Sequence, residues 1–295
     1  MASFDSRPQM QRLAHALLTG VVAACASASD RDALGSSETV VVPSGALRLR
    51  GALCRPQGAG PFPAVLFLHG SGRPTATADG QRDQRNRLQE PGILGPIFAE
   101  HGYVLLYLFR RGAGLSVGQG TASGDVMDGE PGREQGIRNR LQLELLETDE
   151  MDDALSGLAL LRSLPDVDPR RIAVVGHSFG GSLALLLAER DPSLRAVVDF
   201  AGAAGSWENS PPLRERLLAA ADDCEVPIFF VYAANDYSTA PGLELGAAMA
   251  RLAKPHRLRV YPATGTTPED GHRLVFRDIA AWEEDVFSFL DERVK

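Results

Sequence analysis

The sequence predicts an α/β fold in which helices cover both faces of a mostly parallel sheet. Runs that are apolar throughout, such as residues 64–68 and 228–232, are typical of strands buried on both faces of a parallel sheet. Helix-forming runs separate these strands, and such alternation is typical of the α/β class. With 295 residues, 44% of them apolar, the chain is long enough for one domain with a large core.

The predicted strands share a short apolar pattern bounded by turn residues. In chain order they are Thr39–Val42, Leu47–Leu53, Val65–Leu68, Val104–Leu108, Arg171–Val175, Ala196–Phe200, Ile228–Tyr232 and Arg257–Tyr261. Helices follow from the third strand onward, one of them near Asp149–Arg162. Residues 73–96 and 110–142 are polar or glycine-rich stretches that exceed what the sheet needs, so we expect long loops that wall a pocket.

The fifth strand runs into the turn Gly176-His177-Ser178-Phe179-Gly180-Gly181, and a helix follows. A serine at such a bend adopts a strained conformation that projects its hydroxyl above the sheet, while the following helix presents N–H groups to developing negative charge. The pattern alone occurs by chance in many chains. Because a strand precedes it and a helix follows it, Ser178 is the candidate nucleophile.

A serine nucleophile needs a base and an orienting carboxylate, which in this architecture follow it in the order acid, then histidine. Asp236 comes directly after a buried strand, at the carboxyl edge where α/β sheets gather their chemistry. His272 follows the last strand and a turn-rich loop. The sequence therefore predicts a triad of Ser178, His272 and Asp236, with Glu269 as the alternative acid.

An oxyanion hole requires two N–H donors, one from the residue after the nucleophile and one from a loop after an earlier strand. Phe179 is the first predicted donor. The third strand opens into His69-Gly70-Ser71-Gly72, whose small residues let the backbone approach a substrate. We assign the second donor to Ser71, with Gly70 as the alternative, and expect His69 to brace the loop.

Three further residues are candidates for substrate binding. A guanidinium at Arg110 or Arg111 could grip a substrate carboxylate with paired hydrogen bonds. For Arg111 we favour the alternative that it holds its own glycine-rich loop. Trp207, in the short loop after the sixth strand, could supply an apolar wall.

These motifs resemble those of the α/β-hydrolase superfamily, and more narrowly those of dienelactone hydrolases and prolyl-oligopeptidase-like serine hydrolases. The resemblance extends from about residue 38 to the end of the chain, and it implies an α/β-hydrolase fold with loop insertions at the active edge. Its carriers are residues 69–72, Arg111-Gly112-Ala113-Gly114-Leu115-Ser116, residues 176–181, Asn235-Asp236 and Asp270-Gly271-His272. Dienelactone hydrolases proper usually carry a cysteine nucleophile. Ser178 therefore favours ester hydrolysis over the opening of a dienelactone ring.

We expect a serine esterase that cleaves carboxylic esters of small or medium acyl substrates through an acyl-enzyme, without a metal or an organic cofactor. Two alternatives stay open. A serine peptidase of the oligopeptidase or aminopeptidase kind would need acidic residues to bind a free amine, and Asp125, Asp128 and Glu130 are the clustered candidates; the chain lacks the length for the propeller that gates many such enzymes. A non-catalytic binding protein of the same fold is disfavoured by the complete Ser, His and Asp set.

Charge and cysteine content exclude other classes. A net charge of −8 without a run of Lys or Arg argues against nucleic-acid binding and leaves a small molecule as the expected partner. The three cysteines match neither a zinc site nor a disulfide framework.

Residues 1–30 have two interpretations. Arg7 and Arg12 precede an apolar stretch that ends in Val22-Ala23-Ala24-Cys25, which resembles a bacterial export signal with a lipoprotein processing site. The stretch is too short to span a bilayer. The alternative is an amphipathic helix of a cytoplasmic protein. We favour export, to the periplasm, as a lipoprotein or by secretion, with residues 31–295 as the catalytic domain.

Overall fold

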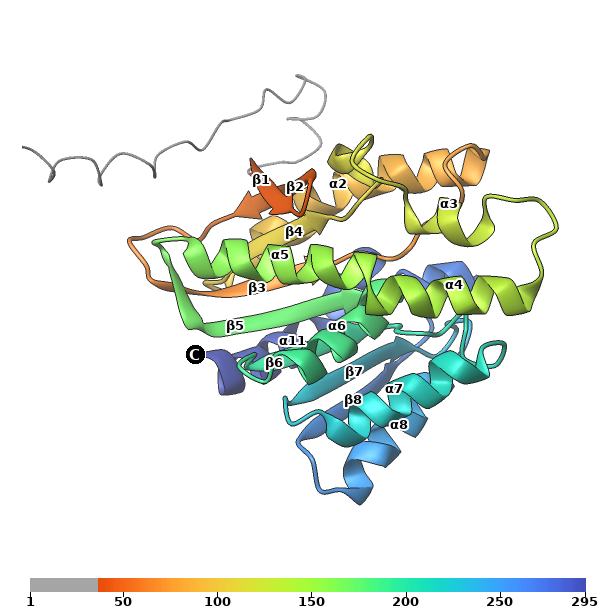
Figure 1. The fold of residues 1–295 in the computed structure, drawn as a ribbon. Coiled ribbons are helices and arrows are strands. Elements are labelled where there is room, and N and C mark those ends of the chain that lie inside the picture. The colour runs from red at the N-terminus through yellow and green to blue at the C-terminus, as the bar shows by residue number, and fades with distance from the viewer. Residues whose placement is uncertain (1–36) are drawn as a thin grey trace, which may run out of the picture.

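The computed structural model describes residues 37–295, which form an eight-stranded sheet between two layers of helices (Figure 1). The strand order is β1-β2-β4-β3-β5-β6-β7-β8. Strand β2 is antiparallel to both of its neighbours, and every other pairing is parallel. The strands are β1 (Glu38–Ser44), β2 (Leu47–Cys54), β3 (Phe62–Leu68), β4 (Val104–Phe109), β5 (Val167–His177), β6 (Ala196–Phe200), β7 (Ile228–Ala233) and β8 (His256–Tyr261).

Helices connect the strands from β3 onward and follow β8. They are α2 (Ala78–Glu100), η1 (Gly114–Ser116), α3 (Ser123–Asp128), α4 (Gln135–Glu147), α5 (Asp149–Ser163), α6 (Phe179–Arg190), α7 (Pro211–Asp223), α8 (Ala240–Arg251), α9 (Pro268–His272), α10 (Leu274–Arg277) and α11 (Ile279–Val294). The mostly parallel α/β sheet predicted from the sequence is confirmed.

The core consists of two apolar layers, one on each face of the sheet. Successive residues of a strand point to opposite faces, so Leu66 of β3 packs with one layer and Phe67 with the other. Helices α4 to α8 cover the first layer, and α2, α10 and α11 cover the second. Because both faces are covered, the central strands are apolar throughout, as the sequence pattern indicated.

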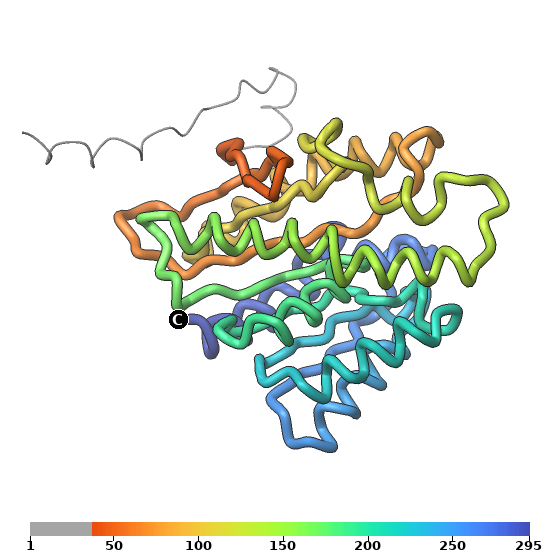
Figure 2. Tube along the Cα trace, viewed as in Figure 1, coloured from red at the N-terminus to blue at the C-terminus, as the bar shows by residue number. Residues whose placement is uncertain are grey.

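The register of the central strands places their carboxyl ends side by side. Leu68, the last residue of β3, pairs with Gly176 near the end of β5, and the next β5 residue, His177, pairs with Phe200 of β6. The loops after β3 and β5 therefore leave the sheet next to each other. The chain between β4 and α4 also extends from this end of the sheet (Figure 2).

The expected long loops are only partly loops, and for residues 73–96 the expectation was wrong. Most of that stretch belongs to α2, which accommodates Pro91 and Pro96 and buries the polar side chains of Arg87 and Glu90. Because α2 contains two prolines and buries polar side chains, its sequence lacks the apolar periodicity of an amphipathic helix. The second stretch holds η1, α3 and most of α4 between shorter turns.

Residues 1–30, with the predicted export signal and Cys25, lie outside the described part of the chain. Across residues 37–295 no helix combines the length and the apolar character that a bilayer span requires.

The packing of β3 leads to a prediction about stability. Leu66 is fully buried at the centre of the sheet, so Leu66→Ala should lower the free energy of unfolding by about 2–5 kcal/mol through lost burial and a residual cavity. Leu252→Ala, at a leucine that is 51% exposed, is the matched control and should change it by less than about 0.5 kcal/mol. Urea unfolding of both variants measures the difference; equal losses would contradict this description of the core.

Candidate active site

The turn between β5 and α6 holds Ser178 in a strained conformation. Its φ of 58° and ψ of −120° are rare for a residue with a side chain. Two flanking glycines make this turn possible. A Cβ atom at Gly176 would lie 2.1 Å from the carbonyl oxygen of Gly180, and one at Gly180 would lie 2.0 Å from the carbonyl oxygen of Leu68. Only backbones without side chains can approach this closely.

The structure brings Ser178, His272 and Asp236 together. The Nε2 atom of His272 lies 2.9 Å from Ser178 Oγ, and its Nδ1 atom lies 2.8 Å from Asp236 Oδ1. Asp236 is buried and also accepts the backbone N–H of Tyr237 at 2.7 Å. A carboxylate only accepts hydrogen bonds, so Nδ1 carries the imidazole proton and Nε2 is free to accept the serine proton.

Glu269, the alternative acid, makes its hydrogen bonds with other residues than His272. Its carboxylate accepts hydrogen bonds from the Tyr237 hydroxyl at 2.7 Å and from Arg73 at 3.1 Å, and both its side chain and that of Arg73 are more than one-third exposed. These two partners hold the pKa of Glu269 below its usual value despite partial burial. The geometry therefore favours Asp236 as the partner of His272.

His177 has a contact that the sequence analysis did not foresee. Its Nε2 atom lies 2.8 Å from the backbone carbonyl oxygen of His272. Burial, together with the nearby His272 and Arg273, lowers its pKa well below the usual value, so the ring is a neutral N–H donor. A polar residue immediately before the candidate nucleophile was the only signal in the sequence. His177 thus ties the turn at Ser178 to the segment that carries His272.

The predicted oxyanion donors are free to bind a ligand. Within residues 37–295 no hydrogen bond occupies the backbone N–H of Phe179, Gly70 or Ser71. A Cβ atom built on Gly70 would lie 3.3 Å from the Cβ atom of Ser178, so this loop contacts the candidate nucleophile. His69 is buried beneath it and contacts the Gly70 carbonyl oxygen at 2.6 Å, in keeping with the expected brace.

Arg110 is placed differently from the expectation of substrate binding. Its side chain is fully buried, pairs with Glu150 at 2.5 Å and donates to the backbone carbonyl of His69. It also lies over the ring of Phe179, with its central carbon 5.2 Å from the ring centroid. A side chain without exposed surface cannot meet a substrate, so the expectation for Arg110 is corrected.

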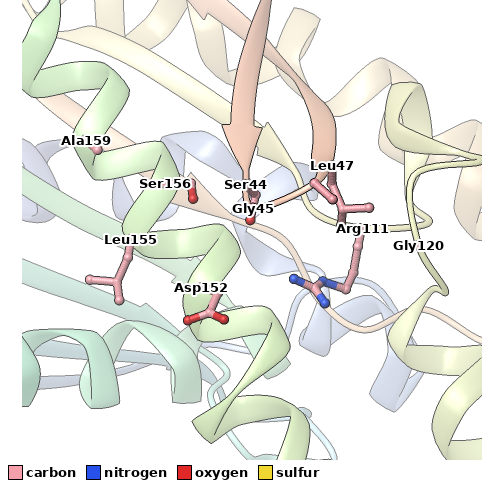
Figure 3. Close-up of a pocket in the computed structure, with 10 residues that line it drawn as sticks. Ser44, Gly45, Leu47, Arg111, Gly120, Asp152, Leu155, Ser156 and Ala159 are labelled. Atoms are coloured by element: carbon pink, nitrogen blue, oxygen red, sulfur yellow. The ribbon is translucent and has the colours of Figure 1, made fainter.

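Arg111 and Trp207 also lie in structural positions. The Arg111 guanidinium binds Asp153 and Asp149 of α5 at 2.8 and 2.6 Å. It lines an open cavity of about 610 Å³ between the β1–β2 turn and α5, and Ser178 is not among the lining residues (Figure 3). Trp207 is buried against the core and donates its ring N–H to Glu244 at 3.1 Å, which corrects its assignment to a pocket wall.

A second buried carboxyl lies on β6, the strand beside the one that leads to Ser178. Asp199 of β6 is 1% exposed and packs against Gly181 at the start of α6. Burial raises its pKa to about 7, partly opposed by the Gly202 backbone N–H, and the nearby Asp236 raises it further.

The sheet and the strained turn at Ser178 define the class of protein: the chain has the α/β-hydrolase fold. An esterase of Pyrococcus furiosus superposes with a TM-score of 0.59 at 16% identity, over 90% of this chain and 95% of that one. The acylaminoacyl peptidase of Pyrococcus horikoshii superposes with a TM-score of 0.58 at 18% identity, over 88% of this chain and 42% of that one. Identities this low establish the fold alone.

The particular family follows from the sequence. The profile of the dienelactone hydrolase family matches residues 94–270, and the chain belongs to this family of hydrolases. A polyketide transferase of a Penicillium species is 30% identical over an alignment of 177 residues, which covers 57% of this chain and 53% of that protein. The chain thus spans about half the length of this relative. The resemblance inferred from the motifs is confirmed.

The raised pKa of Asp199 leads to a prediction about pH. The pKa of Asp199 is about 4 in the unfolded chain and about 7 in the folded protein. Between these two pH values the folded protein binds a proton that the unfolded chain releases. Asp199 by itself should therefore lower the free energy of unfolding by about 2–3 kcal/mol as pH rises from roughly 5 to 8, whereas His69 and His177, whose pKa values are lowered by burial, act in the opposite direction below about pH 6.5.

Asp199→Asn should remove this contribution, because the amide does not titrate, so the free energy of unfolding of the variant should rise by about 2–3 kcal/mol relative to that of the wild type between roughly pH 5 and pH 8. Asp222→Asn, at an exposed position of α7, is the matched control and should keep this contribution. Urea unfolding across the pH range gives the slope for each variant. A slope in Asp199→Asn equal to that of the wild type would show that Asp199 is ionised throughout.

Proposed function

We propose that this protein hydrolyses carboxylic esters of small or medium acyl substrates, with Ser178 as nucleophile, His272 as general base and Asp236 as the orienting acid. The observation that carries the proposal is the pair of contacts made by one imidazole. His272 lies 2.9 Å from Ser178 Oγ on one side and 2.8 Å from Asp236 Oδ1 on the other. This arrangement is the one that activates a serine hydroxyl at neutral pH.

In the first half of the reaction Ser178 Oγ attacks the ester carbonyl carbon while His272 Nε2 takes the hydroxyl proton. The carbonyl oxygen becomes an oxyanion that accepts hydrogen bonds from the N–H groups of Phe179 and Ser71. When the tetrahedral intermediate collapses, the C–O bond to the alcohol breaks and His272 returns the proton to the alcohol. Asp236 keeps the imidazole in the required tautomer.

In the second half water attacks the acyl-enzyme by the same route. His272 takes a proton from the water, the oxyanion forms again in the same position, and the proton is passed to Ser178 as the acid leaves. An alcohol in place of water would give a transferred acyl group, and the Penicillium relative is named as a polyketide transferase.

Ester hydrolysis is better supported than recognition of a free amine by a peptidase. Of the acidic residues predicted to bind an amine, Asp125 accepts hydrogen bonds from the backbone and side chain of Thr75 at 2.7 and 2.8 Å. Asp128 pairs with Arg138 at 2.6 Å. Glu130 pairs with Arg133, and its side chain is 82% exposed. Internal partners thus engage all three carboxylates, and none is a buried free acceptor for an ammonium group.

The aromatic ring of Tyr237 provides apolar surface for the substrate beside the base. It is 48% exposed, and its centroid lies 5.0 Å from that of His272. A single sheet carries every proposed catalytic group, so we propose that residues 31–295 act as one catalytic domain.

The proposal is tested with p-nitrophenyl esters of graded acyl length beside aminoacyl and prolyl p-nitroanilides. We expect turnover of esters and not of anilides. Ser178→Ala and His272→Ala should each reduce ester kcat by about 10⁴-fold or more while the circular dichroism spectrum stays unchanged, because members of a triad act as a unit. Mass spectrometry with an added alcohol separates hydrolysis from acyl transfer. Full activity in Ser178→Ala would refute the proposal, and anilide cleavage would replace it by the peptidase alternative.

The assignment of the acid is tested separately. Asp236→Asn should lower ester kcat by about 10³–10⁴-fold, because the amide favours the wrong imidazole tautomer. Glu269→Gln should lower it by less than about tenfold, since Glu269 contacts Arg73 and Tyr237 rather than the imidazole. Kinetics of the two variants at one pH decide between the acids; the reverse order of effects would assign the role to Glu269.

A further inference from the structure

Arg87 of α2 is a buried cation close to residues 69–72, which form the candidate oxyanion loop. The residue is 5% exposed, and its Nε atom has no hydrogen-bond partner. Among the ion pairs formed within residues 37–295, none involves Arg87. Burying a guanidinium without a paired carboxylate costs free energy, so the contacts that Arg87 does make require an explanation.

Its hydrogen bond goes to the oxyanion loop. The Arg87 Nη2 atom donates to the Gly70 carbonyl oxygen at 3.0 Å, and its guanidinium lies against Gly72, where a Cβ atom would be 3.0 Å from the same nitrogen. The Gly70 oxygen receives two other donors. Arg110 Nη2 lies 3.3 Å from it, and His69 Nδ1 lies 2.6 Å from it.

His69 acts as a donor in this cluster. Its Nε2 atom accepts the backbone N–H of Arg110 at 3.1 Å, so the ring proton is on Nδ1 and points to the Gly70 oxygen. Three N–H groups, two of them cationic, thus converge on one carbonyl oxygen that has two lone pairs.

The other end of the same peptide group is the N–H of Ser71. In a trans peptide the C=O and N–H bonds point in opposite directions, so the Ser71 N–H points away from the two guanidinium groups. Hydrogen bonds to an amide oxygen polarise the amide and make its N–H a stronger donor. The loop contacts Ser178 at Gly70, and no hydrogen bond within residues 37–295 takes up the Ser71 N–H.

We infer that Arg87 is a positioning residue for ester cleavage: by holding the Gly70 carbonyl it aims and polarises the Ser71 N–H toward the oxyanion. The inference rests on the proposed function. The inference also distinguishes Ser71 from Gly70 as the second oxyanion donor. Arg110 binds the carbonyl of His69 as well, and that peptide carries the Gly70 N–H, whereas Arg87 acts only on the peptide that carries the Ser71 N–H.

The test compares an ester with its thionoester, in which sulfur replaces the carbonyl oxygen. Attack on the thionoester places the negative charge on sulfur, a much weaker hydrogen-bond acceptor, so the ratio of kcat/KM for the two substrates reports on the oxyanion donors. Arg87→Met should lower ester kcat by about tenfold or more, with little change in KM, and should lower the ester-to-thionoester ratio by about tenfold. A merely structural defect would reduce turnover of both substrates equally and leave the ratio unchanged.

Arg216→Met is the matched control. Arg216 of α7 is a partly buried arginine that pairs with Glu147 and Glu189, and it is not part of the proposed catalytic machinery. This variant should keep the wild-type ratio. Arg87→Met removes a cation without a carboxylate partner and keeps the side-chain volume, so the variant should fold. Arg87→Lys keeps the charge and should recover part of the ratio, and it serves as the second variant if Arg87→Met does not fold.

The outcomes are distinct. A wild-type protein that turns over neither ester removes the proposed function and this inference with it. Wild-type turnover with an ester-to-thionoester ratio in Arg87→Met within about twofold of the wild type overturns the inference alone and favours Gly70 as the second donor. A lowered ratio in Arg87→Met, with none in Arg216→Met, supports it.

Discussion

The site depends on the contact between three backbone segments at the end of β3, the end of β5 and the start of α6. A side chain at Gly180 would collide with the Leu68 carbonyl, and one at Gly176 would collide with the Gly180 carbonyl. This contact fixes how far Ser178 projects from the sheet and places the loop that begins at His69 directly beside it. The strain at Ser178 is tolerated because apolar strands and the buried helix α6 hold both ends of the turn.

Behind this contact lies a cluster of buried charged side chains. Arg110 pairs with Glu150. Glu90 of α2 accepts a hydrogen bond from the Tyr107 hydroxyl and another, at 3.1 Å, from Arg273. Removing such groups from water costs free energy that the pairs only partly recover, so their presence is a poor argument for stability. Their geometry has a clearer effect. They join α2, β4 and α5 to the segments that carry the oxyanion loop and His272, and so they restrict how these segments move.

The sequence was sufficient for the fold class and for the positions of Ser178, Asp236 and His272, because Ser178 and Asp236 lie just after recognisable strands and His272 lies in the segment between the last strand and the last helix. It was insufficient for Arg87 and Arg110. Both are charged residues whose burial depends on partners far along the chain, such as Glu150 for Arg110. Helix α2 was missed for a related reason, since its buried face includes polar side chains and its interior includes two prolines. Local patterns record periodicity, whereas the burial of a charged side chain is decided by tertiary contacts.

The carboxylate of Glu269 has a consequence for how the site is prepared for a substrate. It binds Arg73 from the loop after β3 and Tyr237 from the loop after β7, and Glu269 itself belongs to the segment after β8. Partly exposed pairs of this kind add little to the free energy of unfolding. They do connect three separate loops through one carboxylate. When one of these loops is ordered, the conformational entropy of the other two is therefore lowered. The entropy lost in assembling the candidate catalytic groups is in this way lost during folding, before a substrate binds.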